Sequence, residues 1–507
     1  MVENDGRMTR ATGRTVGVAA LLAGPTVLAF FSGGYFDQPR LWAAIAAFGL
    51  VLLAVLVSEK PLPSSRSGQL AIAGLAALTG WTALSIGWAP LAGPAFHDMQ
   101  RLLLYLAVLV AAAALLREWA AAEAVEPALA AGALIVIGYG LAGRLLPGVV
   151  HLHQSLSAAG RLEQPLTYWN ATGALAAMGF VLCARLTGDP ERRTVVRAGA
   201  AAASVPLGVG VYLSFSRGAL AAVAAGLLVL LLLAFDRRQL RAIAVCLAGA
   251  VVACVPAGLF GGVRALHGSL GSREGQGAIM LVLLLAIAAA CAYLATRSAG
   301  DPRGFKRVRR SHVVIALGAL LLLTVLLVAR VHEKTTAARG ATTARLGSVE
   351  SNRYAYWKVA GHMFTAHPLR GEGSASFGVE WLKHRKIPEA AQDAHSLYIE
   401  TAAELGLVGL AALALFLGGA AVSARRAFVR DPALTAGWIA ASSVWLVHAG
   451  LDWDWEMPAV TLLPILLAGG LIAQGDRRDA AVSLPAAEPA PAPERQPLPT
   501  APDPDLA

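Results

Sequence analysis

The sequence predicts an all-α protein that crosses a membrane many times, and three observations support this fold class. Hydrophobic residues make up 56% of the 507 residues and charged residues only 15%, which is too little polar surface for a water-soluble fold. The mean hydropathy is +0.59. Apolar runs near the roughly 20 residues needed to cross a bilayer recur along the chain. We therefore expect a polytopic bundle of about 12–14 transmembrane helices with one long, partly helical external loop.

The apolar runs define the candidate spans in order. The run near Val16 is followed by another apolar segment rather than by a small-residue cleavage site, so we interpret it as a retained anchor and not as a signal peptide. About fourteen spans are expected. They begin near Val16, Leu41, Leu70, Leu102, Val125, Ala171, Val195, Ala219, Ala242, Ala278, His312, Ala402, Ala433 and Ala459.

Basic residues predict the orientation of the chain. With the N-terminus in the cytoplasm, the alternate loops on that side collect most of the lysines and arginines, as the positive-inside rule requires. The net charge of +10 therefore needs no nucleic-acid partner. The opposite, external side holds short loops around Asp37, His97, Leu152, Ser214, His267 and Trp453 and one long loop. We expect both termini in the cytoplasm of a bacterium and a multi-pass protein in its cytoplasmic membrane.

Four regions follow from this pattern. Residues 1–329 are expected to form a transmembrane domain of about 11 spans, residues 330–400 the extracytoplasmic loop, and residues 401–475 the C-terminal transmembrane helices. Residues 476–507, rich in Pro and Ala towards their end, are expected to be a disordered cytoplasmic tail. Within the loop, the spacing of apolar residues from Asn352 to Ala366 predicts an amphipathic helix that lies over the membrane domain as a lid.

Neither cysteines nor acidic pairs indicate a metal centre. The four cysteines all fall inside apolar runs without metal-ligand spacing, so they are interpreted as small core residues. Asp452 and Asp454 are two positions apart in an Asp-Trp-Asp-Trp-Glu segment, but two carboxylates without further ligands are a weak cation signal. We expect no essential metal and no cofactor.

His395 is the candidate for proton transfer. It lies where the polar loop runs back into an apolar helix, and an imidazole with a pKa of about 6.5 accepts a proton at neutral pH. A histidine hydrogen-bonded to backbone at a helix start is the alternative, and position alone favours it. Asp393 is close enough in sequence to orient the ring. Glu400 and Glu404 are either functional acids or ordinary interfacial charges, and Gly406 and Gly409 are expected to allow close approach of a neighbouring helix.

Arginines on the external side are the candidates for anion binding. Arg217 sits at the external end of a span, where the positive-inside rule gives it no reason to be. It is either a snorkelling side chain or part of a site for a lipid diphosphate, whose oxygens guanidinium groups bind with paired hydrogen bonds. Convergence of several arginines is the testable form of this hypothesis. The other external arginines include Arg101, Arg144, Arg161, Arg264, Arg273, Arg345, Arg353 and Arg370.

Several motifs in order resemble a known family. Ser216-Arg217-Gly218-Ala219 opens a span, and Arg353-x3-Trp357 leads to a His-Pro-Leu-Arg-Gly-Glu-Gly segment at 367–373. His395-Ser396, nine residues and then Gly406-x-x-Gly409 follow. Together these segments resemble the O-antigen ligase and O-antigen polymerase superfamily. Arg161 with Tyr168-Trp169-Asn170, and His448-x3-Asp452 with Pro458, also look like family segments, so the resemblance covers roughly residues 161–470.

The resemblance implies a C-type glycosyltransferase membrane fold. Such an enzyme would move a glycan from an undecaprenyl diphosphate carrier to an acceptor hydroxyl on the outer face of the membrane, without metal or nucleotide sugar and with inversion. By resemblance, His395 would take the proton of the acceptor hydroxyl, and Arg217 with Arg353 would bind the diphosphate. Arg161, Arg370, Arg101 and Asp452 complete the expected set for the diphosphate or glycan. The expected partners are the lipid-linked glycan, an acceptor glycan or second lipid-linked glycan, and membrane lipids.

Other functions stay open at this point. The candidate spans outnumber the twelve or so common in ligases, and the Ala- and Arg-rich composition is typical of high-GC bacteria, some of which have no lipopolysaccharide core as acceptor. A polysaccharide polymerase that extends a lipid-linked glycan is therefore a close rival. A lipid-linked glycan flippase or transporter is the alternative from another class, although the span centres hold few ionisable residues for ion coupling. A scaffold protein would be indifferent to loss of His395.

Overall fold

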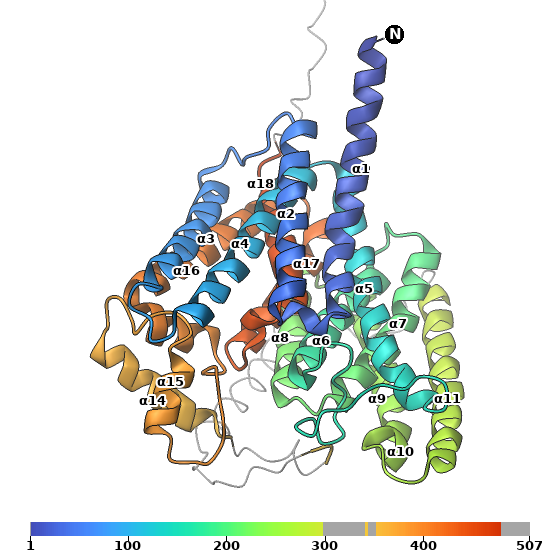
Figure 1. Ribbon diagram of the computed structural model, residues 1–507. Helices are drawn as coiled ribbons and strands as arrows, with labels where there is room; N and C mark the ends of the chain where they lie inside the picture. Colours follow the sequence, from blue (N-terminus) through green and yellow to red (C-terminus); the bar gives the residue numbers. More distant parts are fainter. Residues whose placement is uncertain (1, 298–339, 343–350, 478–507) are drawn as a thin grey trace, which may run out of the picture. The chain divides into compact units, whose positions relative to one another are not determined.

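The computed structural model describes residues 2–297, 340–342 and 351–477, and every regular element in these ranges is helical (Figure 1). The described residues up to Asp476 belong to one compact unit. The helices of the first half are α1 (Val2–Ala29), η1 (Ser32–Gly34), α2 (Asp37–Val57), α3 (Arg66–Ser85), α4 (Ala92–Leu115), α5 (Trp119–Leu145), α6 (Trp169–Gly188), α7 (Thr194–Leu213), α8 (Arg217–Leu233) and α9 (Arg237–Leu259). They are followed by α10 (Gly261–Arg264), α11 (Leu270–Arg297), α14 (Arg353–Ala366), α15 (Phe377–His384), α16 (Leu397–Arg430), α17 (Pro432–Ala449), η2 (Asp454–Glu456) and α18 (Pro458–Gly475).

The helices agree with the expected spans. Ten described helices are long and apolar enough to cross a membrane, which confirms the polytopic all-α fold class. Three further helices, α3, α8 and α17, occupy other positions where the sequence predicts a span. The remaining candidate, near His312, lies outside the described residues.

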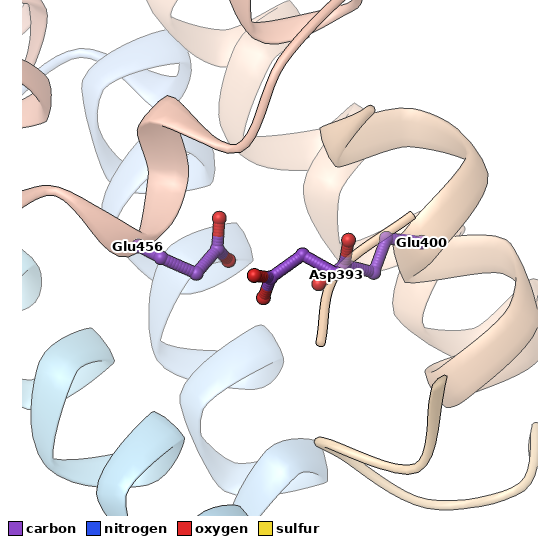
Figure 2. A group of neighbouring side chains, drawn as sticks. All are labelled: Asp393, Glu400 and Glu456. Atoms are coloured by element: carbon purple, nitrogen blue, oxygen red, sulfur yellow. The ribbon is translucent and has the colours of Figure 1, made fainter. Parts of the chain in front are cut away.

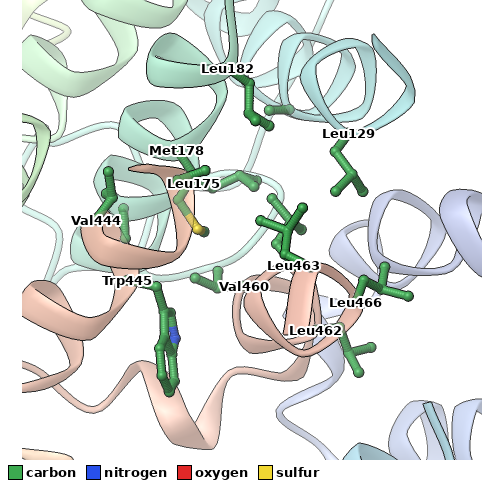
Figure 3. Packing of buried hydrophobic residues seen from close by; sticks show 14 of the residues in the cluster. Leu129, Leu175, Met178, Leu182, Val444, Trp445, Val460, Leu462, Leu463 and Leu466 are labelled. Carbon is green, nitrogen blue, oxygen red and sulfur yellow. The ribbon is translucent and has the colours of Figure 1, made fainter. Parts of the chain in front are cut away.

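Two helices form the centre of the bundle. All residues of the most apolar window of α6 are buried, and nearly all of that window in α18, whereas α2 and α11 leave most of theirs exposed. Figure 3 shows Leu175 and Met178 of α6 near Val460 and Leu463 of α18, with Trp445 of α17 beside them. An apolar helix in a membrane can face either lipid or other helices, and α6 and α18 face other helices. The central pair thus provides a fixed frame for the loops at its ends.

Loops that the sequence predicts on one side meet at one end of the bundle. Oδ2 of Asp37, the first residue of α2, lies 3.0 Å from Nε2 of His97 in α4. The ring centroids of Tyr35 and Trp453 are 5.5 Å apart, and the Tyr35 hydroxyl donates to Oε1 of Gln392 at 3.1 Å. The candidate site lies at this end.

The described part of the long loop builds a small core of its own. α14 begins and ends close to the predicted limits and buries Tyr356, Val359 and Met363 against Phe377 and Trp381. This cluster is separate from the main core and reaches α16 through the buried Ala403 in its second turn. The predicted amphipathic helix therefore packs on the start of α16, so the loop is anchored at the point where the polypeptide re-enters the bundle.

The break in α16 corrects the role expected for Gly406. Gly406 has φ +64° and ψ −161°, a conformation that L residues rarely adopt, and a Cβ there would lie 2.4 Å from the carbonyl oxygen of Leu369. The amide of Leu407 donates to the carbonyl of Pro368 at 2.8 Å. Gly406 therefore admits the backbone of the loop and not a neighbouring helix. The three atoms nearest to a Cβ on Gly409 belong to Leu405. The expectation of helix packing is therefore wrong for Gly406 and stays a prediction for Gly409.

Candidate functional site

His395 sits in a turn that its neighbours hold in place. Its backbone has φ +56°, which is uncommon for a non-glycine residue and is found most often at constrained or functional positions. The amide of Ala394, immediately before it, donates to Glu400 Oε2 at 2.7 Å. The carbonyl of Ala394 accepts from Nε1 of Trp357 in α14 at 3.1 Å. The turn is thus fixed both by the first helical turn of α16 and by the loop helix.

The hydrogen bond of His395 defines its tautomer. Nδ1 lies 3.0 Å from the backbone carbonyl oxygen of Asp393, and a carbonyl only accepts, so Nδ1 carries the proton and Nε2 has the lone pair. The sequence suggested the Asp393 carboxylate as the orienting group, and the structure uses the Asp393 carbonyl instead. Burial lowers the pKa of His395 below 6.5; Asp452 opposes this effect and Arg353 adds to it. The ring is therefore neutral at neutral pH.

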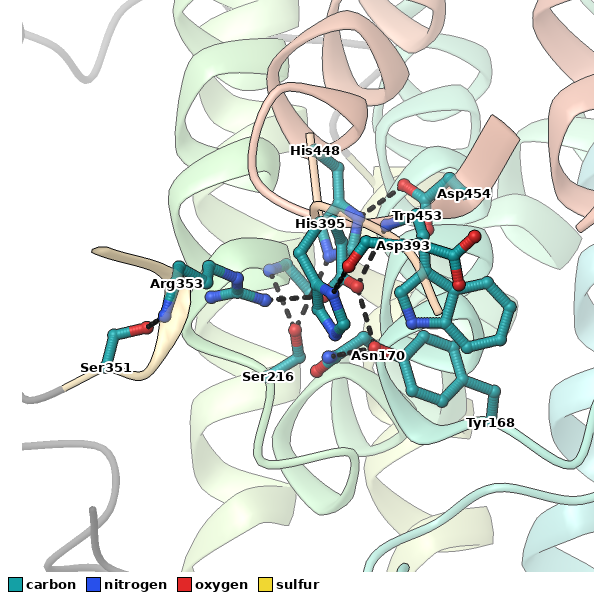
Figure 4. Close-up of polar contacts among 12 residues, drawn as sticks. Tyr168, Asn170, Ser216, Ser351, Arg353, Asp393, His395, His448, Trp453 and Asp454 are labelled. Carbon is teal, nitrogen blue, oxygen red and sulfur yellow. Dashed lines mark hydrogen bonds and ion pairs between the residues drawn. The ribbon is translucent and has the colours of Figure 1, made fainter. Parts of the chain in front are cut away.

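Asp452 bonds several members of the polar cluster around His395. Figure 4 shows Arg353, Tyr168 and His395 of this cluster. Oδ2 of Asp452 accepts from Nη2 of Arg353, the first residue of α14, at 2.6 Å. Its Oδ1 accepts from the hydroxyl of Tyr168 at 2.6 Å and from the amide of Trp453 at 3.0 Å. Burial alone would raise the pKa of Asp452, but Arg353 and His395 outweigh it and leave the pKa below its ordinary value. Asp452 is therefore an anion that fixes Arg353.

Arg353 retains hydrogen-bonding capacity in this arrangement. Its Nη2 is occupied by Asp452, but its Nε is buried and has no hydrogen-bond partner among the described residues. A buried donor without a partner costs free energy unless a ligand or water satisfies it. Asp452 directs the guanidinium group, and the open donor leaves Arg353 able to bind an additional anion.

Arg217 is the first residue of α8 and directly follows Ser216, which contacts the same region. The preceding Ser216 caps this helix by accepting from the amide of Ala219 at 3.2 Å. Ser216 Oγ also lies 3.4 Å from Nε2 of His448 in α17, and His448 Nδ1 contacts the carboxylate of Asp454. Figure 4 shows Ser216, His448 and Asp454 together with Arg353 and His395. The turn that carries Arg217 is thus bonded to the α17–α18 segment that holds Asp452.

The contacts of Arg161 and Arg370 lie with other residues, and Arg345 lies outside the described residues. Arg161 donates to the carbonyls of Ser157 and Ala158 at 2.5 and 2.7 Å and lies over the ring of Trp169, 3.5 Å from its centroid. Arg370 is exposed, with its guanidinium 5.9 Å from the ring centroid of Trp88. These contacts suit a structural role for Arg161 and a surface position for Arg370.

Arg101 belongs to a second, acidic group of side chains. Its Nη2 lies 2.9 Å from Asp98 and 3.3 Å from Glu456. Glu404 accepts from the amides of Ala375 and Phe377 at 2.9 Å each, so this acid anchors the loop that follows α14. Because Glu400 likewise bonds the turn before His395, both acids of α16 hold backbone in place, a role that neither interpretation of the sequence included.

The structure adds two residues to the site that the sequence did not single out as candidates. Tyr168 donates to Asp452, accepts from Asn170 Nδ2 at 2.7 Å and stacks on Trp453 with ring centroids 4.2 Å apart. His448 links Ser216 to Asp454. Both stand in segments that resemble the family, which was the only sequence signal for them.

One family model matches part of the chain. Residues 269–414 match the family described as O-antigen ligase, a segment that includes Arg353, His395 and the broken start of α16. The match confirms the resemblance to the O-antigen ligase and polymerase superfamily. It supports, in general terms, a glycosyltransferase-like activity on lipid-linked glycans in a multi-pass membrane protein. The comparison with curated proteins found no match.

Proposed function

Because residues 269–414 match the O-antigen ligase family, we propose that the protein transfers a glycan from an undecaprenyl diphosphate carrier to an acceptor hydroxyl. The reaction takes place on the outer face of the bacterial cytoplasmic membrane, with both termini in the cytoplasm. The observation that carries the proposal is the proximity of a neutral histidine, His395, to Arg353, whose buried Nε has no hydrogen-bond partner among the described residues. A neutral base beside an anion site suits transfer from a diphosphate leaving group.

In this mechanism each group has one task. The acceptor hydroxyl gives its proton to Nε2 of His395, and its oxygen forms a bond to the anomeric carbon of the donor. The bond from that carbon to the phosphate oxygen breaks, and the electron pair leaves with undecaprenyl diphosphate. Arg353 and Arg217 stabilise the charge that develops on the leaving group, and Asp452 directs Arg353. Attack opposite the leaving group inverts the anomeric centre, and no metal takes part in the step.

The test is a transfer assay with purified protein in lipid nanodiscs. The donor is an undecaprenyl-diphosphate-linked oligosaccharide, supplied with and without acceptor glycans, and product length is read by gel and mass spectrometry. We expect His395→Ala to lower the rate by about 10²–10⁴-fold and Arg217→Ala by about 10²–10³-fold. The matched controls are His384→Ala and Arg385→Ala, because both residues are exposed at the end of α15.

The products decide among the candidate functions. A single addition to a separate acceptor identifies a ligase, and a ladder formed from donor alone identifies a polymerase. Full activity of His395→Ala contradicts the proposed base. Movement of the lipid-linked glycan across the bilayer without any transfer would favour a flippase.

A further inference from the structure

Three carboxylates from different segments face one another beside the His395 turn. Asp393 comes from the end of the loop, Glu400 from the first turn of α16, and Glu456 from η2 before α18. One oxygen of each lies within 4.8 Å of one from each of the others. Figure 2 shows the side chains of Asp393 and Glu456 directed towards each other, with Glu400 next to them. Asp393 also orients His395 through its carbonyl, so the carboxylate triad adjoins the cluster around Asp452.

Too little positive charge lies near the triad to balance three carboxylates. Arg101 lies 3.3 Å from Glu456, but the same nitrogen lies closer to Asp98, at 2.9 Å. No ion pair joins Asp393 or Glu400 to a described cation, and Glu404 adds a further acid nearby. Burial raises the pKa of Asp393 to about 7, with Arg101 opposing and Asp98 adding to the effect. Buried carboxylates so close together need either shared protons or an additional cation.

A cavity beside the triad contains an independent sign of a ligand. It measures about 30 Å³, enough for a water molecule. Thr82, Arg101, Glu400 and Glu456 are among the residues of its wall, and Asp393 lies outside that wall. Thr82 is fully buried, and its hydroxyl has no hydrogen-bond partner among the residues that the structure describes. A buried hydroxyl is normally satisfied. The open Thr82 hydroxyl in an acidic cavity therefore indicates water or a hydrated ion as its partner.

We propose that Asp393, Glu400 and Glu456 bind one divalent cation of the Ca²⁺ type. Ca²⁺ takes six to eight oxygen ligands in flexible geometry, so three carboxylates and waters in the cavity suit it. Mg²⁺ requires near-ideal octahedral geometry, which three carboxylates from separate segments provide less well. The Thr82 hydroxyl bonds a water of the ion's hydration shell. The ion fastens the loop, α16 and the segment before α18 together and so stabilises the turn of His395, without taking part in glycan transfer.

Trp455 allows the binding to be measured directly. It lies in the wall of the same cavity, so excitation of tryptophan should sensitise the emission of Tb³⁺ bound in place of Ca²⁺. The full-length protein is reconstituted in nanodiscs of zwitterionic lipid, which avoids cation binding by anionic headgroups. We expect saturable Tb³⁺ emission that Ca²⁺ displaces with a Kd of about 10⁻⁴–10⁻³ M, as in extracellular calcium modules, and that Mg²⁺ displaces at least tenfold more weakly.

Variants separate this site from other acids. Asp393→Asn removes one ligand charge without touching the Arg101 pair, and Glu456→Gln removes another. We expect both to lose at least nine-tenths of the Tb³⁺ emission and the rise in Tm that Ca²⁺ gives to the EDTA-treated wild type. Glu380→Gln, an acid of α15 outside the triad, should retain both responses. Two results together would overturn the proposal in favour of shared protons. The wild type would show neither saturable emission nor a Ca²⁺-dependent Tm, and its Tm in EDTA would rise on acidification.

Discussion

His395 can be tested through the pH dependence of transfer. A proton acceptor must be neutral, so the rate falls as the pH drops through the pKa of the base. Because burial lowers the pKa of His395 below 6.5, we expect the acid limb of kcat/KM to lie below pH 6.5, with a flat profile above it. Asp452 opposes the lowering, so in Asp452→Asn the limb should move to still lower pH, together with a loss of rate. An acid limb at or above pH 6.5 in the wild type would argue against His395 as the base.

The role of Arg353 can be tested with a substitution that keeps the positive charge but changes the arrangement of the N–H donors. Arg353→Lys retains a cation near Asp452 but has no Nε donor, whereas the wild-type guanidinium holds Asp452 with Nη2 and keeps Nε open. A charged hydrogen bond contributes about 1.5–3 kcal/mol, so we expect kcat/KM to fall about ten- to hundredfold. Arg385→Lys, on the exposed end of the same loop core, is the matched control. Equal rates for both variants would mean that Arg353 serves the fold alone.

The break in α16 couples the helix to the loop that carries the site. Gly406→Ala places a Cβ at φ +64° and 2.4 Å from the carbonyl oxygen of Leu369, so the segment from Pro368 to Gly371 must shift. The backbone conformation alone costs about 1–3 kcal/mol. We expect a lower Tm and faster proteolysis of the loop. Gly418→Ala in the same helix is the control, because no atom lies within 4 Å of its Cβ and alanine favours the helix, so its Tm should be unchanged or slightly higher.

Helices were predictable from the sequence to different degrees. A span must satisfy its backbone internally and be apolar over about 20 residues, so composition alone locates it. The periodicity of residues 353–366 is also local and predicted α14. The break at Gly406 was not predictable in this way, because it depends on the approach of Pro368 and Leu369, residues far along the chain. A glycine in a helical pattern indicates close approach but not which segment approaches.

Across the whole molecule, the site depends on contacts between distant residues. His395, Arg353 and Arg217 were predictable as chemistry-bearing residues from motif and position. The cluster around Asp452 was not predictable, because Arg353 and Asp452 are 99 positions apart and Tyr168 and Asp452 are 284 apart. The charge of an arginine in the sequence does not reveal whether backbone carbonyls already bind it, as they do Arg161. Tertiary packing therefore decides which of the external arginines reaches Asp452, as Arg353 does.

The proposed orientation of the whole bundle can be tested with single cysteines. The native cysteines are buried or half-buried, so background labelling in intact cells should be low. Leu156 follows α5 towards the end that holds the site, and Val195 begins α7 at the other end; both side chains are highly exposed. We expect a membrane-impermeant maleimide to label Leu156→Cys in intact cells and Val195→Cys only after permeabilisation. The reverse pattern would place His395 in the cytoplasm, where a donor on the outer leaflet is out of reach, and would therefore contradict the transfer mechanism itself.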